Sequence, residues 1–187
     1  MTRIIAGSLG GRKLKTLPGA ATRPTTDRVK EAVFSALESR LGSLQGLSVL
    51  DLYAGSGSLG FEAQSRGASE VVFCESQAKA QDVIKANARD LGVRALIWSA
   101  PVERTLASGK ERAFDLVLAD PPYPLTEADV VAFLTQLTAG WLRDGAIVVL
   151  ERSTRSVEPS WPQGLRVLNS KTYGETKIWY LTYEEAQ

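Results

Sequence analysis

The sequence predicts an α/β fold with a doubly wound, mostly parallel β-sheet. Between Gly46 and Glu151, short runs rich in Val, Ile and Leu alternate with stretches of helical periodicity. This alternation is typical of parallel strands that are buried on both faces and connected by helices. The length of 187 residues and the 44% of hydrophobic residues allow one core of ordinary size. We therefore expect one main domain with a small amino-terminal extension.

Five strands and four helices are expected in the central part of the chain. The strands are assigned to Ser48–Tyr53, Glu70–Cys74, Ala95–Ser99, Asp115–Ala119 and Ala146–Leu150. The helices between them are assigned to Leu59–Arg66, Gln77–Gly92, Val102–Ser108 and Thr126–Leu142. Helices of this kind provide the crossovers that neighbouring parallel strands require.

The two ends of the chain carry antiparallel hairpin patterns. Arg3–Ile5 and Arg12–Leu17 flank a cluster of glycines, which favours a small hairpin. Leu165–Tyr173 and Thr176–Tyr183 alternate in β fashion around Gly174. We expect the second pair to add a terminal antiparallel hairpin to the sheet.

A helix is expected directly after the first hairpin. Thr25 or Thr26 is its expected N-cap, and its apolar face comprises Val29, Val33, Phe34, Leu37 and Leu41. We divide the chain into a basic hairpin extension at 1–25, outside the doubly wound core, and a main domain at 26–187.

The composition excludes several kinds of site chemistry. Cys74 is the single cysteine and the chain contains no histidine. An internal disulfide framework, a Cys/His zinc site and every histidine-based catalytic dyad are therefore excluded. No apolar run approaches the roughly 20 residues that span a bilayer, and Met1–Lys15 lacks the apolar centre of a signal peptide. We expect a cytoplasmic protein without a metal site or membrane contact.

The net charge of +1 hides an asymmetry along the chain. Residues 1–30 contain seven Lys or Arg side chains and one acidic residue, Asp27, whereas the remainder is net acidic. A basic end on an acidic body favours contact with a polyanion such as RNA. A solvated basic end without a partner is the alternative.

The segment Asp51–Gly60 connects the first central strand to a helix and is rich in glycine. Its glycines allow a tight turn and a close approach of the backbone to a ligand at the helix N-terminus. Glu75 stands 20 residues after Gly55 and follows the next strand. A carboxylate at that place can accept hydrogen bonds from both hydroxyls of a ribose. These features predict a nucleotide-like cofactor.

Three interpretations of this loop are open. Gly55, Gly57 and Gly60 match the G-x-G-x-x-G pattern of NAD-binding domains. Asp51, however, places a carboxylate just before the loop, which disfavours a pyrophosphate and suits the cationic methionine part of S-adenosylmethionine. The whole stretch resembles motif I of class I methyltransferases. A glycine-rich turn that only packs a helix on a strand is the third interpretation.

The tetrapeptide Asp120-Pro121-Pro122-Tyr123 follows the fourth central strand, at the sheet edge that carries the glycine loop. Both prolines lack an N–H donor, so this loop is rich in acceptors. Asp120 and the Pro121 carbonyl can hold an exocyclic amino group, and Tyr123 can stack on its ring. The tetrapeptide resembles the D/N-P-P-Y/F motif of amino-group methyltransferases. A diproline strand end with a core tyrosine is the alternative.

These residues favour direct transfer of a methyl group to nitrogen. Covalent catalysis of the C5-pyrimidine type requires a cysteine nucleophile, and Cys74 is instead expected inside a buried strand. Positioning and electrostatics then carry most of the catalysis. Asp120 or water is the expected proton acceptor.

Nearly the whole chain resembles the RsmD family, bacterial 16S ribosomal RNA guanine-N2 methyltransferases that use S-adenosylmethionine. The matching stretches are Arg3–Gly7, Gly11–Leu14, Arg23–Glu31, Leu59–Ala63 with Ser65–Ala68, and Asp120–Tyr123. The resemblance implies a class I, Rossmann-like methyltransferase fold. It also implies 16S ribosomal RNA or the small ribosomal subunit as the partner, and we expect a monomeric enzyme.

The resemblance implies three sets of functional residues. The target guanine is expected to bind to Asp120, Pro121, Pro122 and Tyr123. The cofactor is expected to bind to Asp51, Tyr53, Ala54, Gly55, Ser56, Gly57 and Glu75, and to backbone groups near Ala100 and Val102. The latter two substitute for an acidic residue that many class I methyltransferases carry after the third strand. RNA is expected to bind to Arg3, Arg12, Lys13, Lys15, Arg23 and Arg28.

Alternatives of other classes also stay open. An NAD-dependent enzyme and a non-catalytic RNA-binding module are the two rivals outside methyl transfer. Among methyltransferases, adenine N6 in RNA or DNA is the alternative target, because the tetrapeptide alone does not distinguish one amine from another. The role of Arg23-Pro24-Thr25 is open between cofactor, RNA and helix capping.

Overall fold

The computed structural model describes residues 2–17, 27–109, 112–122 and 124–185. Its helices are α1 (Asp27–Leu41), α2 (Ser58–Ser65), α3 (Ala78–Leu91), α4 (Val102–Ala107) and α5 (Glu127–Thr138). Its strands are β1 (Thr2–Arg3), β2 (Lys13–Leu14), β3 (Ser48–Leu52), β4 (Glu70–Cys74), β5 (Leu96–Trp98), β6 (Phe114–Ala119), β7 (Leu142–Ser153), β8 (Leu165–Tyr173) and β9 (Thr176–Tyr183). Every element expected from the sequence is present.

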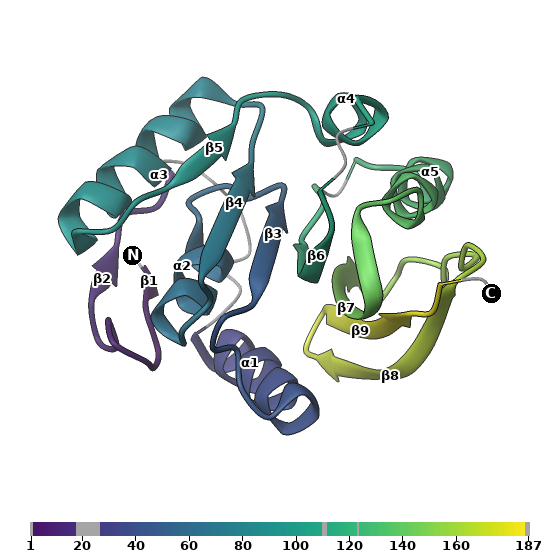
Figure 1. Cartoon of the computed structure of the whole chain (residues 1–187), viewed down its shortest axis with the longest axis horizontal. Coiled ribbons are helices and arrows are strands. Elements are labelled where there is room, and N and C mark those ends of the chain that lie inside the picture. The colour runs from purple at the N-terminus through teal and green to yellow at the C-terminus, as the bar shows by residue number, and fades with distance from the viewer. Residues whose placement is uncertain (1, 18–26, 110–111, 123, 186–187) are drawn as a thin grey trace.

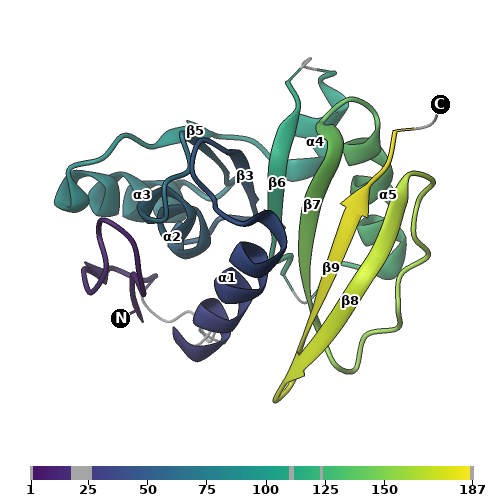
Figure 2. The same ribbon diagram turned by 60° about the horizontal axis from the view of Figure 1, so that its bottom comes forward.

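The main sheet contains seven strands in the order β5-β4-β3-β6-β7-β9-β8. Strands β5, β4, β3, β6 and β7 pair in parallel, and β9 is antiparallel to both β7 and β8. Figure 2 shows this terminal hairpin at the edge of the sheet, beyond β6 and β7. Because β9 lies between β7 and β8, the strand order differs from the 3-2-1-4-5-6 order of dinucleotide-binding folds. The predicted doubly wound sheet with a terminal hairpin is confirmed.

Helices cover both faces of the sheet (Figure 1), and a separate hydrophobic core lies on each face. In the first core, on one face, α1, α2 and α3 contribute side chains such as Phe34, Phe61 and Ile84. In the second core, on the other face, α4 and α5 contribute Leu106 and Phe133. Because both faces are covered, β3 is buried along its whole length and β6 is buried except at Asp115, which explains why these strands are mostly apolar.

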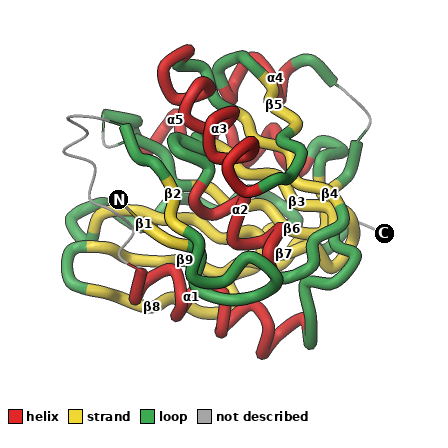
Figure 3. Tube along the Cα trace, turned by 90° about the vertical axis from the view of Figure 1, so that its left-hand side faces the viewer, coloured by secondary structure: helices red, strands yellow, loops and turns green. Residues whose placement is uncertain are grey.

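The amino-terminal hairpin is smaller than expected and is part of the first core. β1 and β2 pair through two residues each, and they lie beside α2 (Figure 3). Ile4 and Leu14 are fully buried in the core that α1, α2 and α3 share. The expectation that this segment lies outside the core was therefore wrong, because alternate hairpin residues are apolar and find a partner surface.

The boundaries of α5 and β7 differ from the expected ones by several residues. Helix α5 ends at Thr138 instead of Leu142, because Gly140 adopts a φ of 102°, which ends the helical turn. Strand β7 is correspondingly longer, beginning at Leu142. The expected caps Thr25 and Thr26 lie outside the described residues.

Within the described part of the chain, no helix combines the length and the apolar character needed to cross a bilayer.

Candidate active site

The register of the parallel strands brings the predicted site residues to one edge of the sheet. Leu52, the last residue of β3, pairs with Cys74 on one side and with Ala119 on the other. Tyr53, Glu75 and Asp120 are the next residues along the three strands. The glycine loop and the Asp-Pro-Pro segment therefore start side by side, as the carboxyl ends of adjacent parallel strands must.

The glycine loop is held in a conformation that leaves its backbone open to a ligand. Gly55 and Gly57 have φ values of 57° and 78°, which favour glycine. The Gly55 N–H donates to Glu75 Oε2 at 2.8 Å. A Cβ atom on Gly55 would approach only the Tyr53 carbonyl, at 4.0 Å. Space beside Gly55 is thus available to a cofactor.

The third glycine has a packing role. The Gly60 N–H donates to Asp51 Oδ2 at 2.9 Å in a buried contact. A Cβ atom on Gly60 would lie 2.3 Å from Phe73 Cε1 and 2.9 Å from the same Asp51 oxygen. Helix α2 can therefore approach β3 and β4 only with glycine at this position.

Asp51 is influenced by two other carboxylates at this edge of the sheet. Burial raises the pKa of Asp51 well above its usual range, the Gly60 N–H counteracts this, and the charges of Asp120 and Glu75 raise the pKa further. Asp51 and Glu75 are 2% and 8% exposed. Such a cluster disfavours a pyrophosphate and favours a cationic ligand. The residues present therefore fit S-adenosylmethionine, whose amino acid part carries positive charge.

Ala54 forms hydrogen bonds through its backbone, whereas Tyr53 makes its contacts through its side chain. The Ala54 N–H donates to the Cys74 carbonyl at 3.1 Å, and the Ala54 carbonyl accepts the Gly57 N–H at 2.8 Å. Tyr53 has a φ of 57°, unusual for a residue with a side chain. Its hydroxyl donates to Glu103 at 3.0 Å, and its ring packs edge-on against Phe133. The Tyr53 side chain thus belongs to the second core.

Glu75 also organises the start of α3. Its Oε1 accepts the Gln77 N–H at 2.8 Å, and its carbonyl accepts from the Gln81 amide at 2.8 Å. Gln81 in turn accepts from the Ser99 hydroxyl at 3.1 Å. This chain of hydrogen bonds connects the predicted ribose-binding carboxylate to the segment after β5.

That segment contains the two residues expected to replace the missing acidic residue. The Ala100 N–H donates to the Trp98 carbonyl at 3.0 Å, and Val102 is 2% exposed at the start of α4. The Val102 side chain therefore packs in the second core. Cys74 is fully buried there, and burial raises its pKa to about 11. The interpretation of Cys74 as a buried core residue is confirmed.

The Asp-Pro-Pro loop leaves the sheet after β6. Asp120 is partly exposed, Pro121 is buried and Pro122 is exposed. The Pro122 carbonyl accepts the Leu125 N–H at 3.0 Å, which closes a turn. Tyr123, the predicted stacking residue, lies outside the described residues.

Arg152, which the sequence did not single out, supports this turn from β7. Its Nη2 donates to the Leu125 carbonyl at 3.4 Å and to Glu127 Oε1 at 2.5 Å. The Arg152 side chain is 6% exposed. The turn after the tetrapeptide is therefore held between α5 and β7.

The basic residues of the amino-terminal segment lie in different surroundings. Arg3 forms an ion pair with Asp27 at 3.3 Å. Arg12 donates to the Asp90 carbonyl at 2.5 Å, and Lys15 pairs with the Asp90 carboxylate at 2.7 Å.

The remaining members of the predicted RNA-binding set differ in exposure. Lys13 and Arg28 are exposed, and Arg23 lies outside the described residues. Lys30, one of the seven basic residues counted above, is fully buried. It therefore cannot contact RNA phosphates in this structure.

Several buried polar residues were not identified from the sequence. Lys30 is spaced with Val33, Phe34 and Leu37 on the apolar face of α1, and this spacing is the signal that could have identified it. Glu62, also fully buried, accepts the N–H groups of Ile5 and Ala6 at 2.7 and 3.1 Å. Glu62 also pairs with Arg66, four residues later, at 2.8 Å. Its backbone partners Ile5 and Ala6 are far away in sequence, so no local pattern in α2 predicts them.

No cluster of three or more potential metal ligands occurs among residues 2–17, 27–109, 112–122 and 124–185.

The chain matches a known family over residues 2–182, the family described as conserved hypothetical protein 95. A putative rRNA methyltransferase, YlbH of Bacillus subtilis, is 35% identical over 94% of this chain and 96% of its own length. The ribosomal RNA small subunit methyltransferase D of Escherichia coli is 33% identical over 99% of this chain and 91% of its own. The protein of that name from Haemophilus influenzae is 34% identical over 92% and 89%.

Solved structures show the same architecture. A putative methyltransferase, yhhF of Escherichia coli, has a TM-score of 0.86 and 28% identity, with 98% of each chain covered. A putative methylase from Haemophilus influenzae has a TM-score of 0.80 and 31% identity, with 98% of this chain and 99% of its own covered. The fold is therefore the class I, Rossmann-like methyltransferase fold.

Proposed function

Because the chain belongs to the conserved hypothetical protein 95 family, the RsmD family, we propose that it methylates the exocyclic N2 of a guanine in small-subunit ribosomal RNA. S-adenosylmethionine is the methyl donor. The observation that carries the proposal is the strand register, which starts the glycine loop, Glu75 and the Asp-Pro-Pro segment at adjacent positions of one sheet edge. The site therefore has a place for a cationic nucleoside cofactor next to a loop suited to an amine.

The residues on the cofactor side bind S-adenosylmethionine and orient it. Glu75 accepts hydrogen bonds from the ribose hydroxyls with the lone pairs that Gly55 and Gln77 leave open. Asp51 lies at the start of the loop and provides negative charge beside the amino acid part of the cofactor. When bound, S-adenosylmethionine supplies an electrophilic methyl group whose leaving group is a neutral thioether.

The residues on the substrate side hold the amine. Asp120 and the Pro121 carbonyl accept its two hydrogens, which turns the nitrogen lone pair towards the methyl group. The N–C bond forms as the C–S bond breaks, and the amine proton passes to Asp120 or to water. Tyr123 stacks on the base. Positioning and electrostatics account for the acceleration in this scheme, without a covalent enzyme adduct.

The basic residues of the amino-terminal segment contact RNA phosphates. The guanine amine can be reached only when the base is turned out of its stack, which costs on the order of a few kcal/mol. Contacts from Arg3, Arg12, Lys13, Lys15, Arg23 and Arg28 to the RNA backbone offset that cost. The related methyltransferases named above act, by their names, on ribosomal RNA, which supports an RNA substrate for this chain.

The test is methylation of ribosomal substrate from cells that lack this protein. Small subunits and their naked ribosomal RNA are incubated with the protein and methyl-labelled S-adenosylmethionine, and the RNA is digested to nucleosides. We expect label in N2-methylguanosine. Label in N6-methyladenosine overturns the choice of amine and supports the adenine alternative.

A thermal shift assay separates the other classes. S-adenosylhomocysteine should raise the melting temperature, and NAD should not. Stabilisation by NAD alone would support a dinucleotide-dependent enzyme. RNA binding with neither cofactor bound would support a non-catalytic module.

A further inference from the structure

Asn87 joins the basic amino-terminal segment to the glycine loop. It lies on α3 and is 1% exposed. Its Oδ1 accepts the Lys15 N–H at 2.8 Å, and its Nδ2 donates to the Lys15 carbonyl and the Ser56 carbonyl, both at 3.0 Å. One buried side chain therefore contacts both the proposed RNA-binding segment and the proposed cofactor loop.

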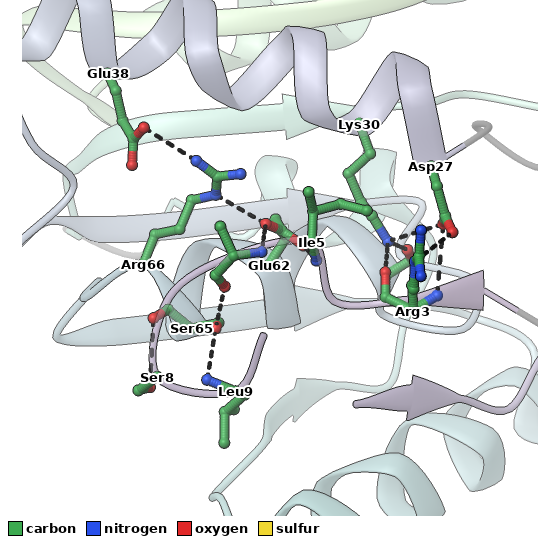
Figure 4. Close-up of polar contacts among 12 residues, drawn as sticks. Arg3, Ile5, Ser8, Leu9, Asp27, Lys30, Glu38, Glu62, Ser65 and Arg66 are labelled. Atoms are coloured by element: carbon green, nitrogen blue, oxygen red, sulfur yellow. Dashed lines mark hydrogen bonds and ion pairs between the residues drawn. The ribbon is translucent and has the colours of Figure 1, made fainter. Parts of the chain in front are cut away.

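Lys30 forms a second connection of the same kind. Its Nζ donates to the Arg3 carbonyl at 2.5 Å, to the Ser58 hydroxyl at 2.9 Å and to the Thr2 hydroxyl at 3.3 Å. Figure 4 shows Lys30 reaching from α1 towards Arg3, with Asp27 nearby. The ammonium group lies 3.9 Å from Asp27 Oδ1. A buried ammonium with three acceptors and a counter-ion has a structural function.

These two connections lie on either side of Gly57. Ser56 and Ser58 are its immediate neighbours, and Gly57 is the left-handed N-cap of α2, with a φ of 78°. A Cβ atom on Gly57 would lie 2.7 Å from Phe61 Cε2. A side chain at position 57 would therefore clash with α2, and the residues on either side of Gly57 are held by side chains that also hold the amino-terminal segment.

The amino-terminal segment is also attached to α2, away from the loop. The Ser65 hydroxyl donates to the Ala6 carbonyl at 2.5 Å and accepts the Leu9 N–H at 2.9 Å (Figure 4). Glu62 accepts the N–H groups of Ile5 and Ala6. These contacts fix the hairpin without touching the residues next to Gly57, so they provide a matched control.

We propose that Asn87 is a positioning residue that couples RNA binding by the amino-terminal segment to cofactor binding by the glycine loop. RNA phosphates that hold Lys15 in place also hold the Asn87 amide, and through it the Ser56 carbonyl. Each ligand then strengthens the binding of the other by the same factor. The inference rests on the proposed function, because it needs a cofactor at this loop and RNA at this segment.

The test measures the affinity for S-adenosylhomocysteine with and without saturating ribosomal substrate, the substrate being the one methylated in the experiment above. We expect the wild-type protein to bind S-adenosylhomocysteine at least fivefold more tightly when the RNA is present. In Asn87→Ala we expect weaker binding of S-adenosylhomocysteine in the absence of RNA. Adding RNA should then raise this affinity by less than twofold.

Ser65→Ala is the matched control. It loosens the hairpin from α2 and should weaken RNA binding, but the cofactor gain at saturating RNA should stay at fivefold or more. If Asn87 had a purely structural role, Asn87→Ala would lower the affinity for S-adenosylhomocysteine by the same factor with and without RNA. The gain on adding RNA would then equal that of the wild-type protein.

Lys30→Met provides the second variant should Asn87→Ala fail to fold. It replaces a buried charge by an apolar side chain of similar length and removes the donor to Ser58. The coupling should fall in this variant as well.

The inference is overturned if wild-type protein binds both ligands without mutual effect, or if a folded Asn87→Ala or Lys30→Met protein keeps the wild-type gain. A wild-type protein that binds no S-adenosylhomocysteine or no ribosomal substrate overturns the proposed function itself. The two failures are therefore distinct.

Discussion

The carboxylate of Glu75 accepts the backbone N–H of Gly55 at 2.8 Å, which joins the segments that follow the paired strands β3 and β4. Its other oxygen accepts the Gln77 N–H at the start of α3, also at 2.8 Å. Glu75 therefore shapes the glycine loop before any ligand is bound, and its remaining lone pairs are available to a ribose. This double role makes Glu75 the first residue to test.

Glu75→Ala should weaken binding of S-adenosylhomocysteine by at least tenfold. The variant loses the charge-assisted hydrogen bonds to the ribose, each worth on the order of 1.5 to 3 kcal/mol, and leaves the Gly55 N–H without its acceptor. Calorimetric titration measures the effect. Glu70→Gln, at the other end of β4, removes only a partly exposed ion pair with Arg112 and should bind normally. Equal affinities in all three proteins would place the ribose elsewhere.

Asp51→Asn should stabilise the unliganded protein while weakening S-adenosylmethionine binding. The amide side chain would keep an oxygen acceptor for the Gly60 N–H and remove a buried charge that lies near Asp120 and Glu75. We expect the melting temperature at neutral pH to rise by about 2–4 °C for each kcal/mol gained. A lower melting temperature together with unchanged cofactor affinity would contradict the role assigned to Asp51.

The same residue makes stability depend on pH. Because the pKa of Asp51 is raised in the folded state, the folded protein binds this proton more tightly than the unfolded chain does. The stability that results is fully present below the ordinary pKa of an aspartate, about 3.9, and is lost as the pH rises through the folded value. Urea unfolding at several pH values should show the advantage of Asp51→Asn growing across that window.

Asp120→Ala should abolish most methyl transfer and leave the affinity for S-adenosylhomocysteine nearly intact, because the proposed partner of Asp120 is the target amine. Transfer of labelled methyl groups to small-subunit RNA is the measurement. In the same assay Tyr123→Phe should retain much activity and Tyr123→Ala should not, since base stacking uses the ring and is worth roughly 1 to 3 kcal/mol. Near-normal turnover of Asp120→Ala would remove Asp120 from the reaction.

Lys13→Ala and Arg28→Ala should weaken RNA binding and reduce its salt dependence. Both side chains are exposed in the proposed RNA-binding set. Each lost phosphate contact should lower the slope of log K against log salt by about 0.7 to 0.9. Filter binding at several salt concentrations gives the slopes. The control is Lys171→Ala, at an exposed position of the carboxy-terminal hairpin, which should bind RNA as the wild-type protein does. Equal slopes in all proteins would show that the basic amino-terminal segment is solvated and does not contact RNA.

Ile4→Ala should destabilise the whole domain by about 2–5 kcal/mol, the usual cost of truncating a buried isoleucine. Ile4 is fully buried, whereas its neighbour Ile5 is only partly buried. Ile5→Ala should therefore cost clearly less in urea unfolding. Small and equal losses of unfolding free energy in the two variants would show that the hairpin contributes little to the core. Deletion of residues 1–17 could then be used to test RNA binding.

The parallel sheet could be predicted from the amino-acid sequence alone, because parallel strands buried on both faces are mostly apolar and need helical crossovers. β4, β8 and β9 begin and end at the predicted residues. The glycine loop and Asp120 could also be placed at a common edge, since the carboxyl ends of parallel strands meet there. These predictions depend on local spacing and on rules of connection that hold for any such fold.

The polar residues that connect distant segments, in contrast, could be identified only in the folded chain. Asn87 contacts Lys15 and Ser56, and Lys30 contacts Arg3 and Ser58, over separations of 27 to 72 residues. Spacing on one helix can mark Lys30 as buried, but it cannot identify the acceptors that stabilise its charge. Those acceptors are backbone carbonyls and hydroxyls whose positions depend on how the hairpin, α1 and α3 pack together, and packing is a property of the complete chain.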